Sequence, residues 1–272
     1  MNYRHAFHAG NFADCFKHAL LVWLLRALQR KPAPFMVLDT HAGIGSYDLT
    51  AGPATRTNEA QDGIFRLLDS PDPALAGYLG VVRALGLYPG SPAIARHLMR
   101  ATDRLVCCEL HPEDAGVLRA RFGRDKQVSV HFRDGYAALR ALLPPPEKRG
   151  LVLIDPPFEQ PDEFYRLADA LKLAHQRFPA AVLAAWYPIK HRAPLRGFHA
   201  TLKDSGIRDI AAAEFCLREP LDPSRLNGCG LLVVNPPYRF EAEAAPLLSA
   251  LLAHLGRGEP GAGTEILRLV DE

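Results

Sequence analysis

The chain has 272 residues, of which 48% are hydrophobic and 23% are charged, and its formal net charge is +2. This composition is that of an ordinary globular protein, and the length suits one large α/β domain with an insertion or two small domains. Five cysteines, an odd number without a CxxC pair, argue against a disulfide framework or a zinc ribbon. The apolar run at 19–25 is too short to span a bilayer, so we expect a cytoplasmic protein without a membrane segment.

The charges are segregated along the chain. Residues 1–35 carry five lysines and arginines against one aspartate, and residues 186–208 repeat this excess. Such segregation is typical of a protein that meets a polyanion along one face. Two solvated basic faces would give the same pattern, so charge alone leaves the partner open.

The predicted elements alternate along the chain. A helix over 13–31 is followed by strand-like runs at 35–40, 104–110, 127–132, 151–155 and 181–187, with helical patterns between them at 112–123 and 161–178. The strand runs are continuously apolar, which is typical of parallel strands covered by helices on both faces. The sequence therefore predicts an α/β fold with a doubly wound, Rossmann-like sheet.

Two segments interrupt this alternation. Residues 47–103 are far longer than one crossover and contain short helical patterns broken by proline and glycine, which predicts a helical insertion subdomain. The main domain would then comprise 1–46 and 104–272. The segment 220–230 has no room for a helix, so the apolar runs on either side of it predict an antiparallel hairpin.

The stretch VLDTHAGIGS at 37–46 has the form of a cofactor-binding turn. A strand ends in Asp39, and Gly43 and Gly45 follow, where the missing side chains let a ligand approach the backbone. A dinucleotide fingerprint would need a third glycine at Asp48, and no GxxxxGK[ST] loop is present in the sequence. An acid ahead of GxG is the arrangement used for S-adenosylmethionine.

Three further acids follow predicted strands. Glu109 is placed to accept hydrogen bonds from ribose hydroxyls, Asp134 to accept from an adenine amino group beside Gly135, and Asp155 closes the fourth strand. The carboxyl ends of parallel strands form the ligand-binding edge of open α/β sheets. Any single acid here is as readily explained as a helix N-cap, but the succession predicts a nucleoside site.

At this point the sequence resembles a known family. The segments YRHAFHAGNFADCFKH (3–18), DTHAGIGSYDL, YPGSP, CELHP, RDGYAAL, LVLIDPPFE and AWYPIK together resemble the RlmJ-type 23S ribosomal RNA adenine-N6 methyltransferases. The resemblance runs from Tyr3 to about Tyr238. It implies a seven-stranded methyltransferase sheet with an antiparallel last strand, and S-adenosylmethionine as cofactor.

The resemblance also implies roles for individual residues. The cofactor contacts carried over by position are His18, His41, Ser91, Glu109, Asp134, Gly135 and Asp155. Asp155 would also be catalytic, and Tyr3 would contact the RNA, with Arg4 beside it as a phosphate partner. The histidines near the N-terminus have no matching Cys/Asp cluster, so we expect no metal.

Two Pro-Pro motifs compete for the catalytic role. In DPPF, the Asp155 carboxylate and the Pro156 carbonyl would accept hydrogens from adenine N6, and Phe158 would stack on a flipped or unpaired base. Many amino-methyltransferases have tyrosine where this chain has Phe158. The second motif, NPPY at 235–238, would end the last strand, which runs antiparallel and so finishes at the opposite edge from the cofactor. DPPF is therefore the predicted site.

Other functions stay open. A DNA adenine methyltransferase would use the same four residues, although the sequence has no separate target-recognition domain. A nucleic-acid-binding module without chemistry is a third interpretation, which the intact DPPF and Asp39/Gly43/Gly45 sets disfavour. We expect a monomer that acts on 23S ribosomal RNA largely free of ribosomal proteins, without membrane or metal; the methylated nucleotide itself is implied only by the family.

Overall fold

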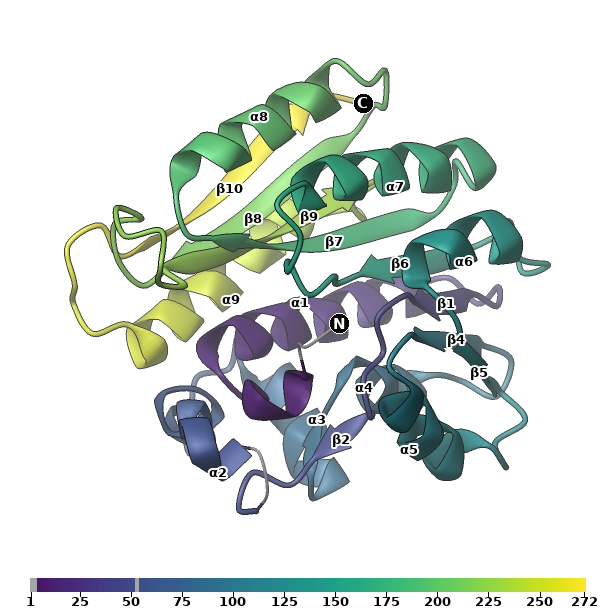
Figure 1. Ribbon diagram of the computed structural model, residues 1–272, viewed down its shortest axis with the longest axis horizontal. Helices are drawn as coiled ribbons and strands as arrows, with labels where there is room; N and C mark the ends of the chain where they lie inside the picture. The colour runs from purple at the N-terminus through teal and green to yellow at the C-terminus, as the bar shows by residue number, and fades with distance from the viewer. Residues whose placement is uncertain (1–3, 52–53) are drawn as a thin grey trace.

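An eight-stranded sheet with helices on both faces forms the centre of the computed structural model, which describes residues 4–51 and 54–272 (Figure 1). Across the sheet, the strands run in the order β10 (Gly263–Val270), β8 (Ile210–Cys216), β9 (Gly228–Val234), β7 (Val182–Ile189), β6 (Gly150–Ile154), β1 (Met36–Asp39), β4 (Arg104–Glu109) and β5 (Val128–Phe132). From β7 to β5 all pairings are parallel, as predicted.

The antiparallel part of the sheet differs from the prediction in one strand. The pair β8 and β9 is the predicted antiparallel hairpin, and β9 also runs antiparallel to β7. However, β9 is not the last strand, because β10 pairs antiparallel with β8 and gives eight strands instead of seven. None of the β10 residues is fully buried, and Glu265 and Arg268 interrupt its apolar residues, so this edge strand lacks the continuous apolar run of the central strands.

Helices cover both faces of the sheet, and several short helices lie in the segment between β1 and β4. In chain order they are η1 (His5–Phe7), α1 (Phe12–Gln29), α2 (Ala54–Thr57), η2 (Glu59–Asp62), η3 (Ile64–Arg66), α3 (Ala76–Leu85), α4 (Ser91–Leu98), α5 (Pro112–Phe122), α6 (Gly135–Leu142), α7 (Glu163–Arg177), α8 (Arg192–Lys203) and α9 (Phe240–Leu255). No helix among the described residues is both long and apolar enough to cross a membrane.

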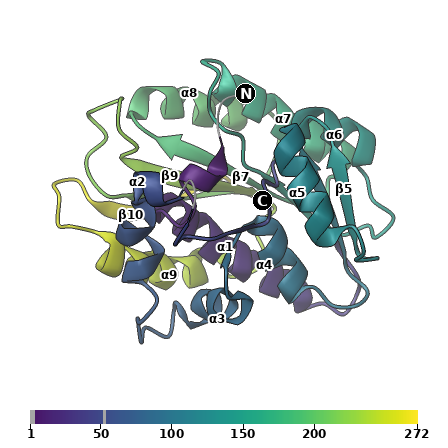
Figure 2. The same ribbon diagram turned by 60° about the horizontal axis from the view of Figure 1, so that its bottom comes forward.

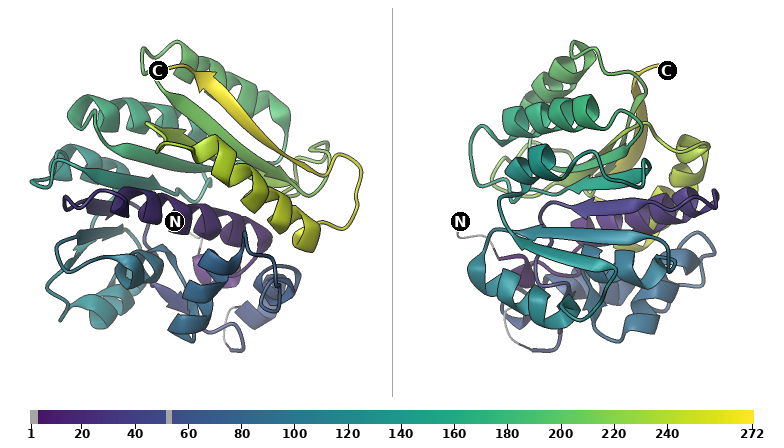
Figure 3. Two further views of the ribbon diagram at one scale, coloured as in Figure 1. Left: turned by 180° about the vertical axis from the view of Figure 1, so that it is seen from behind. Right: turned by 90° about the vertical axis from the view of Figure 1, so that its right-hand side faces the viewer.

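The two faces of the sheet bury separate cores. On one face, α6, α7 and α8 contribute residues such as Leu139, Leu171 and Phe198. On the other face lie α1, α5 and α9, and Figure 3 shows α9 alongside α1 there. Alternate residues of each strand enter alternate cores, which accounts for the continuously apolar strand sequences.

Helix α1 is buried almost all round. It begins at the cap Asn11, whose side chain accepts a hydrogen bond from the Asp14 amide at 2.9 Å. The helix lies between the sheet and the segment 47–103, and Figure 2 shows α3 and α4 beside it. Polar side chains inside such a helix are costly to bury, so Asp14, Lys17 and His18 require a specific explanation.

The segment 47–103 contains short helices and one short strand, β3 (Tyr88–Pro89). That strand pairs antiparallel with β2 (Ser46–Tyr47), which directly follows the glycine turn after β1. Buried residues of α3 and α4 belong to the same core as α1. That this segment forms a subdomain of its own stays a proposal, but its packing joins it to the site.

Candidate active site

A cavity of about 970 Å³ opens at the carboxyl ends of β1, β4, β6 and β7, against the N-terminal half of α1. Its wall contains most of the residues singled out in the sequence: His18, His41, Gly43, Ser91, Glu109, Asp134, Gly135, Asp155, Pro156 and Phe158. Gly45 and Arg4 are not among the lining residues, and Tyr3 lies outside the described residues. Parallel strand polarity brings these residues together from across the chain.

The turn after β1 requires both of its glycines, for different reasons. Gly43 and Gly45 have φ values of +60° and +82°, which side chains rarely adopt. The Gly43 amide donates to Glu109 Oε2 at 2.8 Å, so the turn is fastened to the end of β4. A side chain on Gly45 would press on Leu118 and Phe122 of α5. Gly45 therefore shapes the turn without lining the cavity.

Glu109 is a buried carboxylate with both oxygens engaged. Besides Gly43, it accepts a hydrogen bond from the His111 amide at 2.7 Å. Burial raises the pKa of the Glu109 carboxyl. Each carboxylate oxygen has two lone pairs, so Glu109 retains acceptor capacity toward a ligand hydroxyl.

Asp134 and Gly135 have structural roles as well as places in the cavity wall. Asp134 is the N-cap of α6, and its side chain accepts from the Ala137 amide at 2.8 Å. A side chain on Gly135 would collide with the Thr40 carbonyl oxygen. Asp134 is thus a helix N-cap, which was the alternative explanation for a single acid after a strand. Position 135 requires glycine because a side chain there would meet the backbone of the neighbouring turn.

Two histidines flank this end of the cavity, His18 buried and His41 partly buried. Burial lowers the pKa of His41 to about 4 and that of His18 to about 3, so both rings are neutral at pH 7. His41 packs edge-on against Tyr136, with ring centroids 5.4 Å apart. His18 Nδ1 lies 3.1 Å from the hydroxyl of Tyr88 in β3, which links α1 to the segment 47–103.

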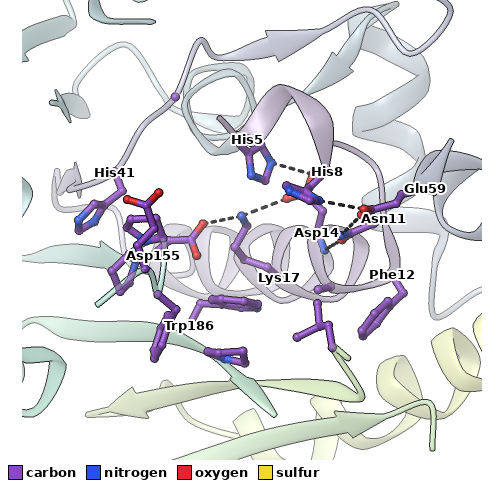
Figure 4. Close-up of a pocket in the computed structure, with 18 of the residues that line it drawn as sticks. His5, His8, Asn11, Phe12, Asp14, Lys17, His41, Glu59, Asp155 and Trp186 are labelled. Carbon is purple, nitrogen blue, oxygen red and sulfur yellow. Dashed lines mark hydrogen bonds and ion pairs between the residues drawn. The ribbon is translucent and has the colours of Figure 1, made fainter. Parts of the chain in front are cut away.

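Asp155 follows β6 and makes an ion pair that the sequence analysis missed. Lys17 Nζ lies 2.5 Å from Asp155 Oδ2 and 3.0 Å from Asp14 Oδ1, so one buried ammonium bridges two carboxylates (Figure 4). Burial by itself would raise the pKa of Asp14, but the Lys17 ammonium and a hydrogen bond with His5 act against it, and this pKa lies well below its usual value. The signal in the sequence was the i, i+3 spacing of Asp14 and Lys17 within an apolar helix.

Asp39 is buried beneath the cavity and does not line it. Its side chain is 1% exposed, and its Oδ2 has no hydrogen-bond partner among the described residues. Burial raises the pKa of Asp39 to about 6. Oδ1 accepts from the His41 amide at 3.3 Å, so this carboxylate supports the turn from below.

The aromatic residue of DPPF faces a second aromatic residue. Phe158 has a φ of +48°, and its ring meets Phe164 and Trp186 edge-on, at centroid distances of 5.0 and 6.0 Å. Trp186 lies on β7 one residue beyond Ala185, the register partner of Ile154, and is therefore next to Asp155. The sequence analysis missed Trp186 because this proximity depends on the pairing of β6 with β7.

The second motif lies at the opposite edge of the sheet, as strand polarity predicted. Val234 at the end of β9 pairs with Leu183 near the start of β7, and the Asn235 side chain donates to the carbonyls of Pro179 and Ala181. Asn235 therefore fastens the beginning of β7. None of residues 235–238 lines the cavity.

The basic segments are partly used within the molecule. Arg4 contacts Asp114 at 2.9 Å and Glu113 at 3.0 Å on α5. In the second segment, Arg192 pairs with the buried Glu214, and Arg208 donates to carbonyls at the C-terminus. Lys190 is exposed and lines the cavity, so only part of each predicted patch faces the site.

Comparisons with known proteins agree with the resemblance found in the sequence. A family model described as "Ribosomal RNA large subunit methyltransferase D, RlmJ" matches residues 32–266. Two curated relatives named Ribosomal RNA large subunit methyltransferase J, from Haemophilus influenzae and Escherichia coli, are each 38% identical and cover 95% of this chain and 96% of their own length.

A solved structure gives the same result for the fold. The crystal structure of a Legionella pneumophila protein, 35% identical, superposes with a TM-score of 0.87 and covers 96% of this chain and 98% of its own. The family model and the curated relatives extend over nearly the whole chain, including the turn after β1 and the DPPF motif. The chain therefore belongs to the RlmJ family of ribosomal RNA large subunit methyltransferases.

Proposed function

We propose that this protein transfers a methyl group from S-adenosylmethionine to the exocyclic N6 of an adenine in 23S ribosomal RNA. The observation that carries the proposal is the place of Asp155-Pro-Pro-Phe158 within the same cavity as the strand-end carboxylates. Family membership supports the substrate class, because both curated relatives are named for methylation of large-subunit ribosomal RNA.

The residues at the cofactor end fit S-adenosylmethionine, which supplies an electrophilic methyl group on a sulfonium. Glu109 offers acceptor capacity for ribose hydroxyls, and Asp134 lines the wall after β5, which is separated by two strands from β6 and Asp155. Asp39 Oδ2, which has no hydrogen-bond partner among the described residues, adds negative potential next to the turn after β1. Neutral His18 and His41 provide hydrogen-bonding groups without repelling a positively charged ligand.

The catalytic end would hold the base and its amino group. Lys17 engages Oδ2 of Asp155, which leaves Oδ1 to accept a hydrogen from adenine N6. The Pro156 carbonyl would accept the second hydrogen, because proline fixes φ and holds the backbone in place. Two acceptors favour the pyramidal nitrogen that develops as N6 attacks the methyl group. Phe158 and Trp186 would bound the base plane.

The test is transfer of tritium from labelled S-adenosylmethionine to unmodified 23S ribosomal RNA, with DNA as the competing substrate. We expect label in RNA as N6-methyladenosine, shown by nucleoside mass spectrometry, and none after Asp155→Ala in a folded protein. Label in DNA alone would favour a DNA adenine methyltransferase. S-adenosylmethionine binding without transfer to either nucleic acid would favour a binding module.

The same proposal extends to the form of the substrate and of the enzyme. We propose that a monomer acts in the cytoplasm, without a metal, on RNA largely free of ribosomal proteins. The support is the family resemblance. Naked 23S RNA should therefore be methylated faster than assembled large subunits, and faster turnover on assembled subunits would contradict this part.

A further inference from the structure

Besides Asp155 and Phe158, the cavity wall includes residues from the C-terminal part of the chain, and we call the part of the cavity next to them its second compartment. This compartment is bounded by the loop between β8 and β9 and by the loop between α9 and β10. Four basic residues line it: Lys190, Arg218, Arg225 and Arg257. We call these four residues and the space between them the basic lobe.

Charge divides the cavity into two ends. On α1, on α5 and α7, and in the loops after β1, β4, β5 and β6, the wall carries seven carboxylates against two cations, Lys17 and Arg166. That end suits a cationic cofactor and repels phosphate. In the basic lobe, four cations meet three carboxylates, Glu59, Asp62 and Glu259.

The carboxylates of the basic lobe are already engaged by other side chains. Glu259 receives both ends of the Arg218 guanidinium, at 2.7 and 2.8 Å, and this pair ties the two loops together. Asp62 pairs with Arg257. Glu59 accepts from His8 at 2.9 Å and from Asn11 at 2.8 Å.

Two of the four cations in the basic lobe differ from Arg218 and Arg257 in forming no ion pair within the described residues. Lys190 and Arg225 are exposed, and neither side chain makes a hydrogen bond or ion pair with another residue of the described part of the chain. Arg225 lies near enough to Asp222 and Glu259 to contribute to lowering the pKa of each carboxyl, but their hydrogen bonds go to Ser224 and Arg218. Two exposed cations in a cavity wall are suited to phosphate.

The end of β7 connects these cations to the catalytic residues. Trp186 and Pro188 lie on one face of β7, Lys190 directly follows the strand, and all three line the cavity. Figure 4 shows Trp186 beneath Asp155 in the cavity wall. A nucleotide with its base at Asp155 would therefore have its backbone directed along this row toward Lys190.

We propose that the basic lobe holds the RNA backbone next to the target adenine, with Lys190 and Arg225 on neighbouring phosphates and Trp186 as the wall between base and backbone. This inference rests on the proposed function and specifies how its substrate is bound. Other proteins that bind single-stranded RNA combine an aromatic surface, on which bases stack, with a cationic groove that follows the backbone.

The experiment compares Lys190→Ala, Arg225→Ala and the double variant with Arg140→Ala, which removes one exposed cation of α6 outside the cavity wall. Affinity for in-vitro-transcribed 23S RNA is measured over a salt series, alongside turnover and S-adenosylhomocysteine affinity. We expect the double variant to bind RNA at least tenfold more weakly. The plot of log affinity against log salt should become less steep, its slope being smaller in magnitude by about 1.4 for two lost phosphate contacts. Its KM for RNA should rise, whereas kcat at saturating RNA and cofactor affinity should not change.

Equal slopes and KM values for the double variant and Arg140→Ala would overturn the inference. Equal binding of a DNA duplex of the same sequence, with the same loss in the double variant, would overturn the assignment to RNA. Because binding is read separately from methylation, a wild-type protein that binds 23S RNA through these two residues but transfers no methyl group would contradict the proposed function and leave the basic lobe supported.

Discussion

At the scale of single residues, the two Pro-Pro-aromatic motifs show how position decides the role of identical chemistry. Phe158 lies in the cavity against Trp186, whereas Tyr238 is 85% exposed at the opposite edge of the sheet. Both motifs begin at a strand end, and both contain one residue with positive φ, Phe158 in the first and Asn235 in the second. The direction of the strand places the first motif at the cavity and the second at the opposite edge.

This difference gives a matched pair of variants. Phe158→Ala should lower kcat/KM for RNA by about 5–100-fold, because base stacking on an aromatic ring contributes roughly 1–3 kcal/mol. Tyr238→Ala removes an aromatic ring from the equivalent position of the second motif and should leave kcat/KM within twofold. Steady-state kinetics with 23S RNA tests both, and a larger loss in Tyr238→Ala than in Phe158→Ala would reverse the assignment.

Glu109 supports a second prediction at this scale. Glu109→Ala should weaken S-adenosylhomocysteine binding by roughly 2–4 kcal/mol, because it removes a charged acceptor and frees the Gly43 amide. Glu113→Ala is the control, since that carboxylate is 70% exposed on the neighbouring helix. Calorimetry measures the affinity of both variants for S-adenosylhomocysteine. Unchanged affinity in Glu109→Ala would mean that Glu109 stabilises the turn after β1 but does not bind the cofactor.

At the scale of elements, α1 joins the parts of the site. Its Lys17, which also pairs with Asp14, reaches Asp155 on one side, and His18 reaches Tyr88 of the segment 47–103 on the other. The side chains of Asp14, Lys17 and His18 line the cavity but are each 5% exposed or less, so they depend on their protein partners. The segment 47–103 thus holds the catalytic end in place through α1, in addition to any contact it makes with RNA.

Substitution of Lys17 should reveal this dependence. Lys17→Met should lower the free energy of unfolding by about 3–5 kcal/mol, because it leaves Asp14 as a buried carboxylate with fewer partners. Turnover should also fall, since Asp155 loses the group that fixes its Oδ2. Urea unfolding and methyl transfer measure the two effects.

The double variant Asp14→Asn, Lys17→Met separates stability from catalysis. Removal of both charges should restore part of the unfolding free energy, but not turnover, because Asp155 is still without its ammonium partner. If Lys17→Met were as stable and active as the wild type, the ion pair would have no role in either property.

At the scale of the whole molecule, buried neutral histidines make stability depend on pH. Burial lowers the pKa of His18 to about 3, and those of His41 and His199 to about 4, from the usual 6.5. Between pH 6.5 and 4 the unfolded chain therefore binds protons that the folded chain does not, and stability falls as the pH falls. Asp39, with a pKa raised to about 6, and Glu109, whose pKa is also raised by burial, oppose this trend.

We therefore expect the free energy of unfolding to decrease by a few kcal/mol, as an order of magnitude, when the pH is lowered from 7 to 4.5. Urea denaturation across this range is the measurement. His199→Gln, outside the cavity wall, removes one of the three titrating rings and should make the decrease smaller. A stability profile that is flat over this range would contradict the neutral state of the three histidines.

The sequence by itself determined the features that depend on local pattern. Continuous apolar runs specified the parallel strands, and the glycines at 43 and 45 specified the turn, because backbone conformation and burial are encoded over a few residues. The order of the βα units was enough to place Asp155 beside the first strand and Asn235 at the far edge. β10 was missed because a half-exposed edge strand gives a weak pattern.

The tertiary structure alone decided which side chains meet. Lys17 and Asp155 are 138 residues apart in the chain, and their ion pair depends on how α1 packs on the sheet. The partners of the basic residues also depend on tertiary structure. Arg192 forms an ion pair with the buried Glu214, whereas Lys190, two residues earlier, faces the cavity. Composition counts charges, but only packing determines which of them are neutralised within the fold and which are left to bind a ligand.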